Sequence, residues 1–133
     1  MVAEAGERLL HIKEGIGLIR RLLDGKTIDH VRSDPVTRAA LERFLEIISE
    51  ASRHVPEEWK QSFGPRIPWR DIANFGNILR HVYDGVDVDV LWSVYQNDLD
   101  PLDQAVDAML AAYAPKDGAP LSMSDLGDFS AIR

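Results

Sequence analysis

One stretch near the middle of the chain contains a histidine, a tyrosine, an arginine and two carboxylates, which are side chains that catalytic and binding sites use. It reads Asn74-Phe75-Gly76-Asn77-Ile78-Leu79-Arg80-His81-Val82-Tyr83-Asp84-Gly85-Val86-Asp87. At about 3.6 residues per turn it spans about four turns of helix. A spacing of three and four residues separates the apolar positions Ile72, Phe75, Leu79 and Val82. This spacing predicts a helix from Pro68 to roughly Tyr83 that buries one side.

Two long helices are predicted before this stretch. In residues 7–24 the same rhythm links Leu9, Ile12, Ile16, Ile19 and Leu23, and Gly25 suits the left-handed position after a helix end. Residues 26–33 have no strong pattern and are expected to be a connector. Asp34-Pro35 is typical of a helix start, with an N-cap followed by proline at the first helical position. The second helix should run to about His54, before Pro56, with inward positions Leu41, Phe44, Ile48, Ala51 and Val55.

Shorter segments complete the expected architecture. Residues 57–62 suggest a short helical turn, and a fourth helix is indicated by Val88, Leu91, Trp92 and Tyr95. A fifth helix is expected to start at Asp100-Pro101, with Leu102, Val106, Met109 and Tyr113 facing inward. Short connections between amphipathic helices imply antiparallel neighbours. We therefore predict an all-α, up-and-down four- to five-helix bundle over residues 1–113, followed by a flexible tail over residues 114–133.

Composition limits the class of protein. A chain of 133 residues without cysteine fits one domain and excludes disulfides and cysteine-type zinc sites. No apolar run is long enough to cross a bilayer, and no signal peptide is recognisable, so a soluble cytoplasmic protein without a membrane partner is expected. No glycine-rich phosphate loop is present, and we expect neither cofactor nor metal.

The net charge of −7 is unevenly distributed. Residues 84–107 contain seven acids and no lysine or arginine, while the other fifteen acids match the fifteen bases. Upstream, Lys60, Arg66, Arg70 and Arg80 oppose a single acid, Asp71. Acidity normally counts against nucleic-acid binding. This distribution leaves open a locally basic entrance, or simply two solvated faces of opposite charge.

On an ideal helix, residues 70–84 form three stripes. Arg70, Asn77, His81 and Asp84 fall opposite the core side, whereas Gly76, Arg80 and Tyr83 lie at the edge of the core face. His81 is therefore expected to point to solvent or to a second subunit. With one histidine and no cysteine in the cluster, metal ligation there is not expected. Trp59, Trp69 and Trp92 are expected to pack rather than to stack on bases.

The chain resembles the HepT-like family, whose members are small helical HEPN-fold toxins paired with a minimal nucleotidyltransferase antitoxin. The likeness rests on ordered motifs along nearly the whole helical region: Arg8-Leu9-Leu10-His11-Ile12-Lys13-Glu14, Ser33-Asp34-Pro35, Leu45-Glu46-Ile47-Ile48-Ser49-Glu50-Ala51-Ser52, Ile67-Pro68-Trp69-Arg70-Asp71-Ile72, the central stretch and Asn97-Asp98-Leu99. The resemblance implies a HEPN bundle that forms a homodimer. It also implies metal-independent RNA cleavage by an Arg-x4-His motif, and a tyrosine two residues after that histidine as a site of AMP attachment.

Carried onto this chain, the resemblance makes His81 the motif histidine and Tyr83 the modified tyrosine. The motif arginine would stand at position 76, where this chain has Gly76. Metal-free RNA cleavage needs a base for the 2′-hydroxyl and a cation for the phosphorane. Arg80, one turn along the same stripe, is the candidate replacement. Residues five apart on an ideal helix point about 140° apart, so either the helix unwinds near His81 or the site is completed across a two-fold axis, where Arg70 or Arg80 of a second subunit could reach the same phosphate.

Three functions remain open on the sequence. The first is a toxin that cleaves RNA without metal, with catalytic residues His81, Arg80 and Asn77 and with Arg70 and Asp84 in supporting positions. The second is a catalytically inactive HEPN dimer that binds a minimal nucleotidyltransferase and receives AMP on Tyr83. The third is a helical interaction module whose polar stripe is only a dimer seam.

Overall fold

The computed structural model describes residues 2–81 and 86–113. The helices are α1 (Val2–Leu23), α2 (Ile28–Ser33), α3 (Pro35–Ser52), α4 (Glu57–Phe63), α5 (Trp69–His81), α6 (Val88–Ser93), the π-helical turn η1 (Val94–Asp98) and α7 (Leu99–Tyr113). The described residues contain no strand. The predicted all-α bundle is confirmed. The predicted tail, residues 114–133, lies outside the described residues.

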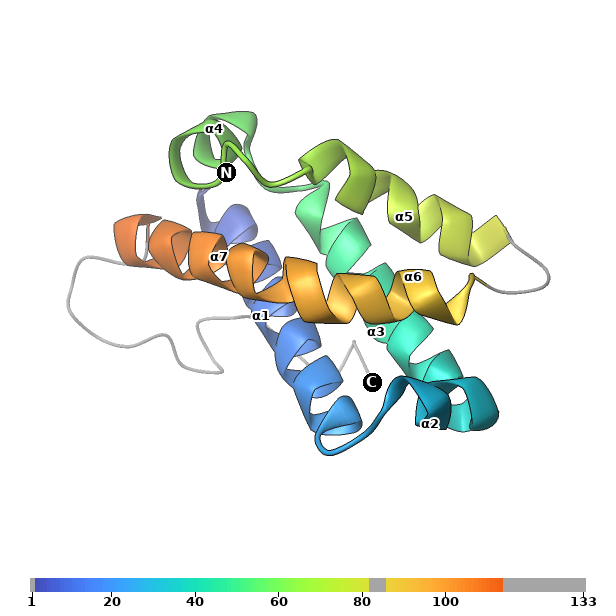
Figure 1. Ribbon diagram of the computed structural model, residues 1–133. Helices are drawn as coiled ribbons and strands as arrows, with labels where there is room; N and C mark the ends of the chain where they lie inside the picture. The colour runs from blue at the N-terminus through green and yellow to red at the C-terminus, as the bar shows by residue number, and fades with distance from the viewer. Residues whose placement is uncertain (1, 82–85, 114–133) are drawn as a thin grey trace.

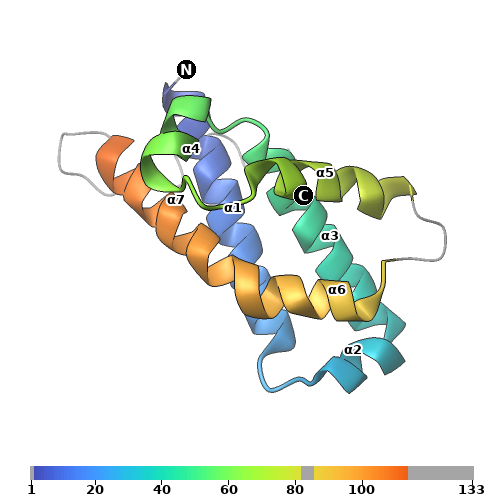
Figure 2. The same ribbon diagram turned by 45° about the horizontal axis from the view of Figure 1, so that its top comes forward.

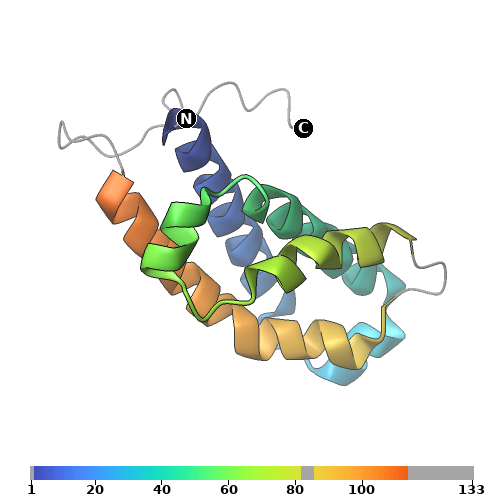
Figure 3. The same cartoon turned by 90° about the horizontal axis from the view of Figure 1, so that it is seen from above.

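The long helices form two pairs of opposite direction (Figure 1). Helices α1 and α3 run antiparallel, and the second pair, α5 and the α6–α7 segment, crosses them. Seen from above, α4 and α5 lie over the first pair (Figure 3), while α2 closes the end of the molecule opposite α4 (Figure 2). Helix α5 packs chiefly on α3, and α7 packs on α1. Because α5 rests mainly on one neighbour, much of its surface remains available for function.

The core is made from the predicted apolar positions. Leu9, Ile12, Ile16, Ile19 and Leu23 of α1 are at most 1% exposed. They meet the inward residues of α3 and α7, namely Leu41, Leu45, Ile48, Leu102, Val106 and Met109. Tyr113 lies at the edge and stacks on Trp59, with the ring centroids 3.9 Å apart. The spacing of apolar residues therefore identified the buried sides of these helices correctly.

Local end signals also hold. Gly25 has a φ of +72°, the left-handed conformation expected after a helix end. At the start of α3, the Asp34 carboxylate accepts a hydrogen bond from the Val36 amide at 3.1 Å, and Pro35 occupies the first helical position.

The expected connector over residues 26–33 is wrong in part, because it contains α2. Thr27 caps this helix by accepting a hydrogen bond from the His30 amide at 3.2 Å, and Val31 is fully buried. Six residues are fewer than two turns, so one buried position cannot reveal a helical period. The caps on either side were the available signal.

The fifth helix expected to start around Asp100-Pro101 is present as α7, which begins at Leu99, but the sequence did not predict that no break separates it from α6. Helices α6 and α7 are continuous through η1, and Pro101 lies inside the segment. Proline has no amide hydrogen and its ring crowds the carbonyl four residues earlier, so an interior proline normally breaks a helix. The wider π turn directly upstream offers a backbone arrangement in which that usual bond is not required.

Candidate active site at the end of α5

The solvent-facing stripe of α5 is present as predicted. Arg70, Asn77 and His81 are all exposed, and His81 is the last residue of the described helix. Asp84 and Tyr83, the other predicted residues, lie outside the described residues. On the opposite side, Ile72, Phe75 and Leu79 pack partly buried against the core. The exposed imidazole is therefore accessible to a substrate.

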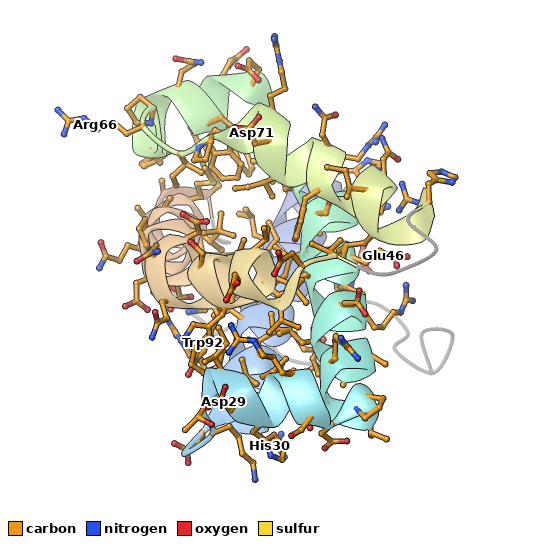
Figure 4. The ribbon with its side chains drawn as sticks, turned by 45° about the vertical axis from the view of Figure 1, so that its right-hand side comes forward. Asp29, His30, Glu46, Arg66, Asp71 and Trp92 are labelled. Carbon is orange, nitrogen blue, oxygen red and sulfur yellow. The ribbon has the colours of Figure 1, made fainter. Side chains whose placement is uncertain are left out.

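Arg80 is held beside this stripe by two contacts. Its Nη2 donates a hydrogen bond to Oδ1 of Asn77, and its Nη1 lies 3.9 Å from Oε1 of Glu46. Glu46, on α3, also accepts a hydrogen bond from Arg43 at 3.0 Å. Glu46 lies beneath the C-terminal end of α5 (Figure 4). The structure thus brings together Arg80 and Asn77, and it adds Glu46, which the sequence did not single out.

Arg70 is not close to His81 within one chain. The two residues are separated by eleven positions on α5, which is about 16 Å along a helix that rises 1.5 Å per residue. A single phosphate cannot contact both side chains of one protomer. Arg70 can share a site with His81 only if it comes from another copy.

Gly76 is buried against α3. Its amide donates a hydrogen bond to the hydroxyl of Ser49 at 2.9 Å, and that hydroxyl donates to the Ala73 carbonyl at 3.0 Å. A Cβ added at position 76 would lie 2.6 Å from the Ser49 hydroxyl, a distance that real Cβ atoms essentially never show. Position 76 is therefore a packing position in this chain, and a larger residue there requires Ser49 to move.

The tryptophans behave mainly as packing residues. Trp59 and Trp69 are buried, and Trp92 is partly buried against Tyr95. The Trp69 indole donates to the Gly64 carbonyl at 2.8 Å, which anchors the start of α5.

An apolar cavity of about 220 Å³ separates α5 from the α6–α7 segment. Its walls come from α3, α5, α6, η1 and α7, and include Leu45, Ile48, Ile72, Phe75, Val90, Val94 and Leu102. Asp98 stands at this cavity, and burial raises the pKa of its carboxyl above the usual value. The cavity lies on the core side of α5, away from the exposed stripe that carries His81.

Among the residues that the structure describes, no group of three or more histidine, aspartate or glutamate side chains is arranged to hold a metal ion. Over the same residues, no helix combines the length and apolarity that crossing a membrane demands.

An exposed histidine and a neighbouring anchored arginine on an all-α bundle are the side chains that acid–base chemistry on a phosphodiester requires. Comparison with known proteins places the chain in a family. The model of the family described as "Ribonuclease HepT-like" matches residues 12–109. The chain belongs to the ribonuclease HepT-like family.

Several curated relatives share this similarity. The chain is 40% identical over 91 residues to a protein named "Probable ribonuclease HepT" from Thermococcus cleftensis, covering 68% of this chain and 82% of the relative. It is 29% identical over 102 residues to a protein named "Putative RNase" from Caldanaerobacter subterraneus subsp. tengcongensis, covering 77% and 90%. A Methanocaldococcus jannaschii protein named "Gamma-glutamylcyclotransferase and putative RNase" is 34% identical over 98 residues, which are 74% of this chain and 44% of that protein. No solved structure matches the chain.

Proposed function

We propose that the protein is a metal-independent endoribonuclease, the toxin of a toxin–antitoxin pair. The observation that carries the proposal is that the exposed residues His81 and Arg80 are neighbours at the end of α5, where the Arg80 guanidinium is held by Asn77 and Glu46. Membership of the ribonuclease HepT-like family supports RNA as the substrate.

In this mechanism His81 takes the proton from a ribose 2′-hydroxyl. The resulting alkoxide attacks the adjacent phosphorus, and the bond from phosphorus to the 5′-oxygen breaks. The leaving 5′-oxygen takes a proton from water and His81 releases its proton to the solvent, so the products are a 2′,3′-cyclic phosphate and a free 5′-hydroxyl. Arg80 neutralises the extra charge on the phosphorane, because a guanidinium offers two parallel donors to phosphate oxygens. Asn77 acts here on Arg80 rather than on the imidazole, since its Oδ1 accepts the Arg80 hydrogen bond.

A homodimer completes this site. Neighbouring side chains on one helix point outward in different directions, so His81 and Arg80 of a single protomer do not converge fully on one atom. Two copies related by a two-fold axis would place Arg80 or Arg70 of one copy near His81 of the other.

The first test is cleavage of a labelled RNA in excess chelator. We expect cleavage by the natural protein, and a loss of about 100-fold or more in His81→Ala and in Arg80→Ala. Arg66→Ala, an exposed arginine beyond the other end of α5, serves as the matched control and should retain activity (Figure 4). Equal activity in His81→Ala and the natural protein would exclude the proposed catalytic residue.

Mixing the two inactive variants tests the shared site. If Arg80 acts across the two-fold axis, the mixed dimer of His81→Ala and Arg80→Ala contains one intact pair. It should regain up to about half of the activity per mixed dimer. A monomer by light scattering would remove the basis for a shared site.

A second function is supported by Gly76, because the position of the motif arginine is packed against Ser49 in this chain. The protein would then be an inactive dimer that binds a minimal nucleotidyltransferase and receives AMP on Tyr83, with pyrophosphate leaving from ATP. Two results together would favour this function over the first: no RNA cleavage by the protein, and an increase of its mass by one AMP that Tyr83→Phe abolishes.

A further inference from the structure

A polar pocket of about 200 Å³ opens beside Arg80. It is lined by an arginine from each of three helices: Arg8 of α1, Arg43 of α3 and Arg80 of α5. The other lining residues are His11, Glu46, Ile47, Glu50 and Ala51. Its arginine donors come from segments far apart in sequence, so the pocket exists only in the folded chain.

The charge of the pocket is opposite to that of the whole protein. Three guanidinium groups face two carboxylates, whereas the chain carries a net charge of −7. The arginines remain accessible, since the side chains of Arg43 and Arg80 are 64% and 36% exposed. Arginine is well suited to phosphate because its planar fork matches two phosphate oxygens.

Glu46 allows the positively charged side chains of Arg43 and Arg80 to lie close together. One of its oxygens, Oε1, lies 3.0 Å from Arg43 and 3.9 Å from Arg80, and only 24% of its side chain is exposed. A partly buried carboxylate between two guanidinium groups reduces their mutual repulsion and limits the orientations that each can take.

We infer that this pocket binds a phosphate of the RNA strand next to the one that is cleaved. Arg8 and Arg43 bind the phosphate, and Glu46 is a positioning residue that holds Arg43 and Arg80. Arg80 belongs both to this pocket and to the pair with His81, so the strand would pass directly from the pocket to the catalytic side chains. This inference rests on the proposed function, and it names the contacts that hold the substrate.

The lining of the pocket indicates which part of RNA is recognised. The lining consists of charged groups, the aliphatic residues Ile47 and Ala51, and one imidazole, that of the partly buried His11; it includes no tryptophan, tyrosine or phenylalanine on which a base could stack. Contacts to phosphate alone carry no sequence information and depend strongly on salt. Binding through the pocket should therefore be indifferent to sequence and weaken as salt increases.

The experiment measures binding of a fluorescent oligouridine by anisotropy, in a His81→Ala background that does not consume the RNA. Arg8→Ala and Arg43→Ala should each weaken binding by about tenfold, which corresponds to about 1.4 kcal/mol. Each should also lower the slope of log affinity against log salt by about 0.7, the value for one phosphate contact on a single strand. Arg66→Ala is the control and should leave affinity and slope unchanged.

Further variants separate the phosphate contacts from the positioning role. In the cleaving protein, Arg43→Ala should raise KM and leave kcat nearly unchanged. Glu46→Ala should lower kcat because Arg80 loses its contact with the Glu46 carboxylate. Glu46→Gln retains the accepting oxygen and should keep most of the natural kcat. Arg43→Glu reverses the charge at an exposed position where folding is not at risk, and it should weaken binding beyond Arg43→Ala.

The possible failures can be distinguished. If the natural protein cleaves RNA and the Arg8 and Arg43 variants bind like Arg66→Ala, this inference is wrong and the proposed function stands. If the natural protein does not cleave, but oligouridine binding still depends on Arg8 and Arg43, the pocket is an RNA site and the catalytic proposal fails.

Discussion

Gly76 is the residue at which α5 and α3 come into close contact. It faces Ser49 across the contact between α5 and α3, and its amide is hydrogen-bonded to the Ser49 hydroxyl. An arginine at this position would have to begin with a Cβ at 2.6 Å from that hydroxyl. Restoring the motif arginine is therefore a change to the packing of α5 as well as to its charge.

At this scale we predict that Gly76→Ala lowers the free energy of unfolding by about 1–2 kcal/mol. A gain of about 0.5–1 kcal/mol in helix propensity is outweighed by overpacking of about 1–3 kcal/mol against Ser49. Urea unfolding measures the effect. Gly17→Ala is the matched control, because its added Cβ meets nothing within 4 Å and should stabilise α1.

A double variant identifies the cause. Adding Ser49→Ala to Gly76→Ala removes the hydroxyl from the closest contact, so the two changes together should cost less than their sum. Stabilisation by Gly76→Ala alone, similar to that by Gly17→Ala, would show that position 76 is not closely packed.

The element that carries the candidate site is anchored at its start. Helix α5 begins at Trp69, whose buried indole donates to the Gly64 carbonyl at 2.8 Å. Lys60 lies over the Trp69 ring at 5.5 Å, and burial lowers the pKa of its ammonium. Since α5 packs chiefly on α3, this anchor is important for the direction in which α5 leaves the preceding loop.

For this element we predict that Trp69→Phe lowers the free energy of unfolding by about 2 kcal/mol. The smaller ring leaves a gap and the Gly64 carbonyl loses its donor, each a cost of about 1 kcal/mol or more. Trp92→Phe, at a partly exposed ring beside Tyr95, should cost less than about 1 kcal/mol. Equal losses in the two variants would mean that the indole hydrogen bond is not the anchor.

At the scale of the whole molecule, a charged cluster joins α1 to α7. Asp103 of α7 accepts hydrogen bonds from Lys13 at 2.8 Å and from Arg20 at 2.9 Å, both on α1. Burial alone would raise the pKa of the Asp103 carboxyl, but the hydrogen bonds from Lys13 and Arg20 outweigh it and hold the pKa below the usual 3.8. The same contact with Asp103 is the main reason that the pKa of Lys13 is raised.

When the pKa of a carboxyl is lower in the folded state than in the unfolded state, its ionised form stabilises the fold at every pH above the unfolded-state pKa. This stabilisation is lost as the pH falls through the folded-state pKa. We predict that Asp103→Asn costs about 1 kcal/mol at pH 7, a modest value because Lys13 and Arg20 are partly exposed to water. Urea unfolding from pH 7 to pH 3 should show the difference narrowing below about pH 4. Asp100→Asn, whose side chain is 74% exposed, should have little effect at any pH. A cost that stays constant down to pH 3 would contradict a charge-based link.

The sequence by itself determined the parts of this protein that depend on neighbouring residues. The three- and four-residue spacing in α1, α3 and α5 identified their buried sides, because a helix repeats about every 3.6 residues and burial follows that repeat. The same periodicity placed His81 and Asn77 on the exposed side of α5. Asp34 and Gly25 marked helix ends because capping satisfies backbone groups within one turn.

Only the tertiary structure decided what depends on residues far apart in the chain. The Gly76 amide bonds a hydroxyl 27 positions earlier, and Glu46 meets Arg80 across two helices. The pocket of Arg8, Arg43 and Arg80 requires three helices to be assembled. No periodicity within one helix encodes such contacts, because they depend on the angle and distance at which separate helices pack. The continuous α6–α7 segment belongs here too: the π turn before Pro101 is a property of the folded backbone, which a proline in the sequence does not reveal.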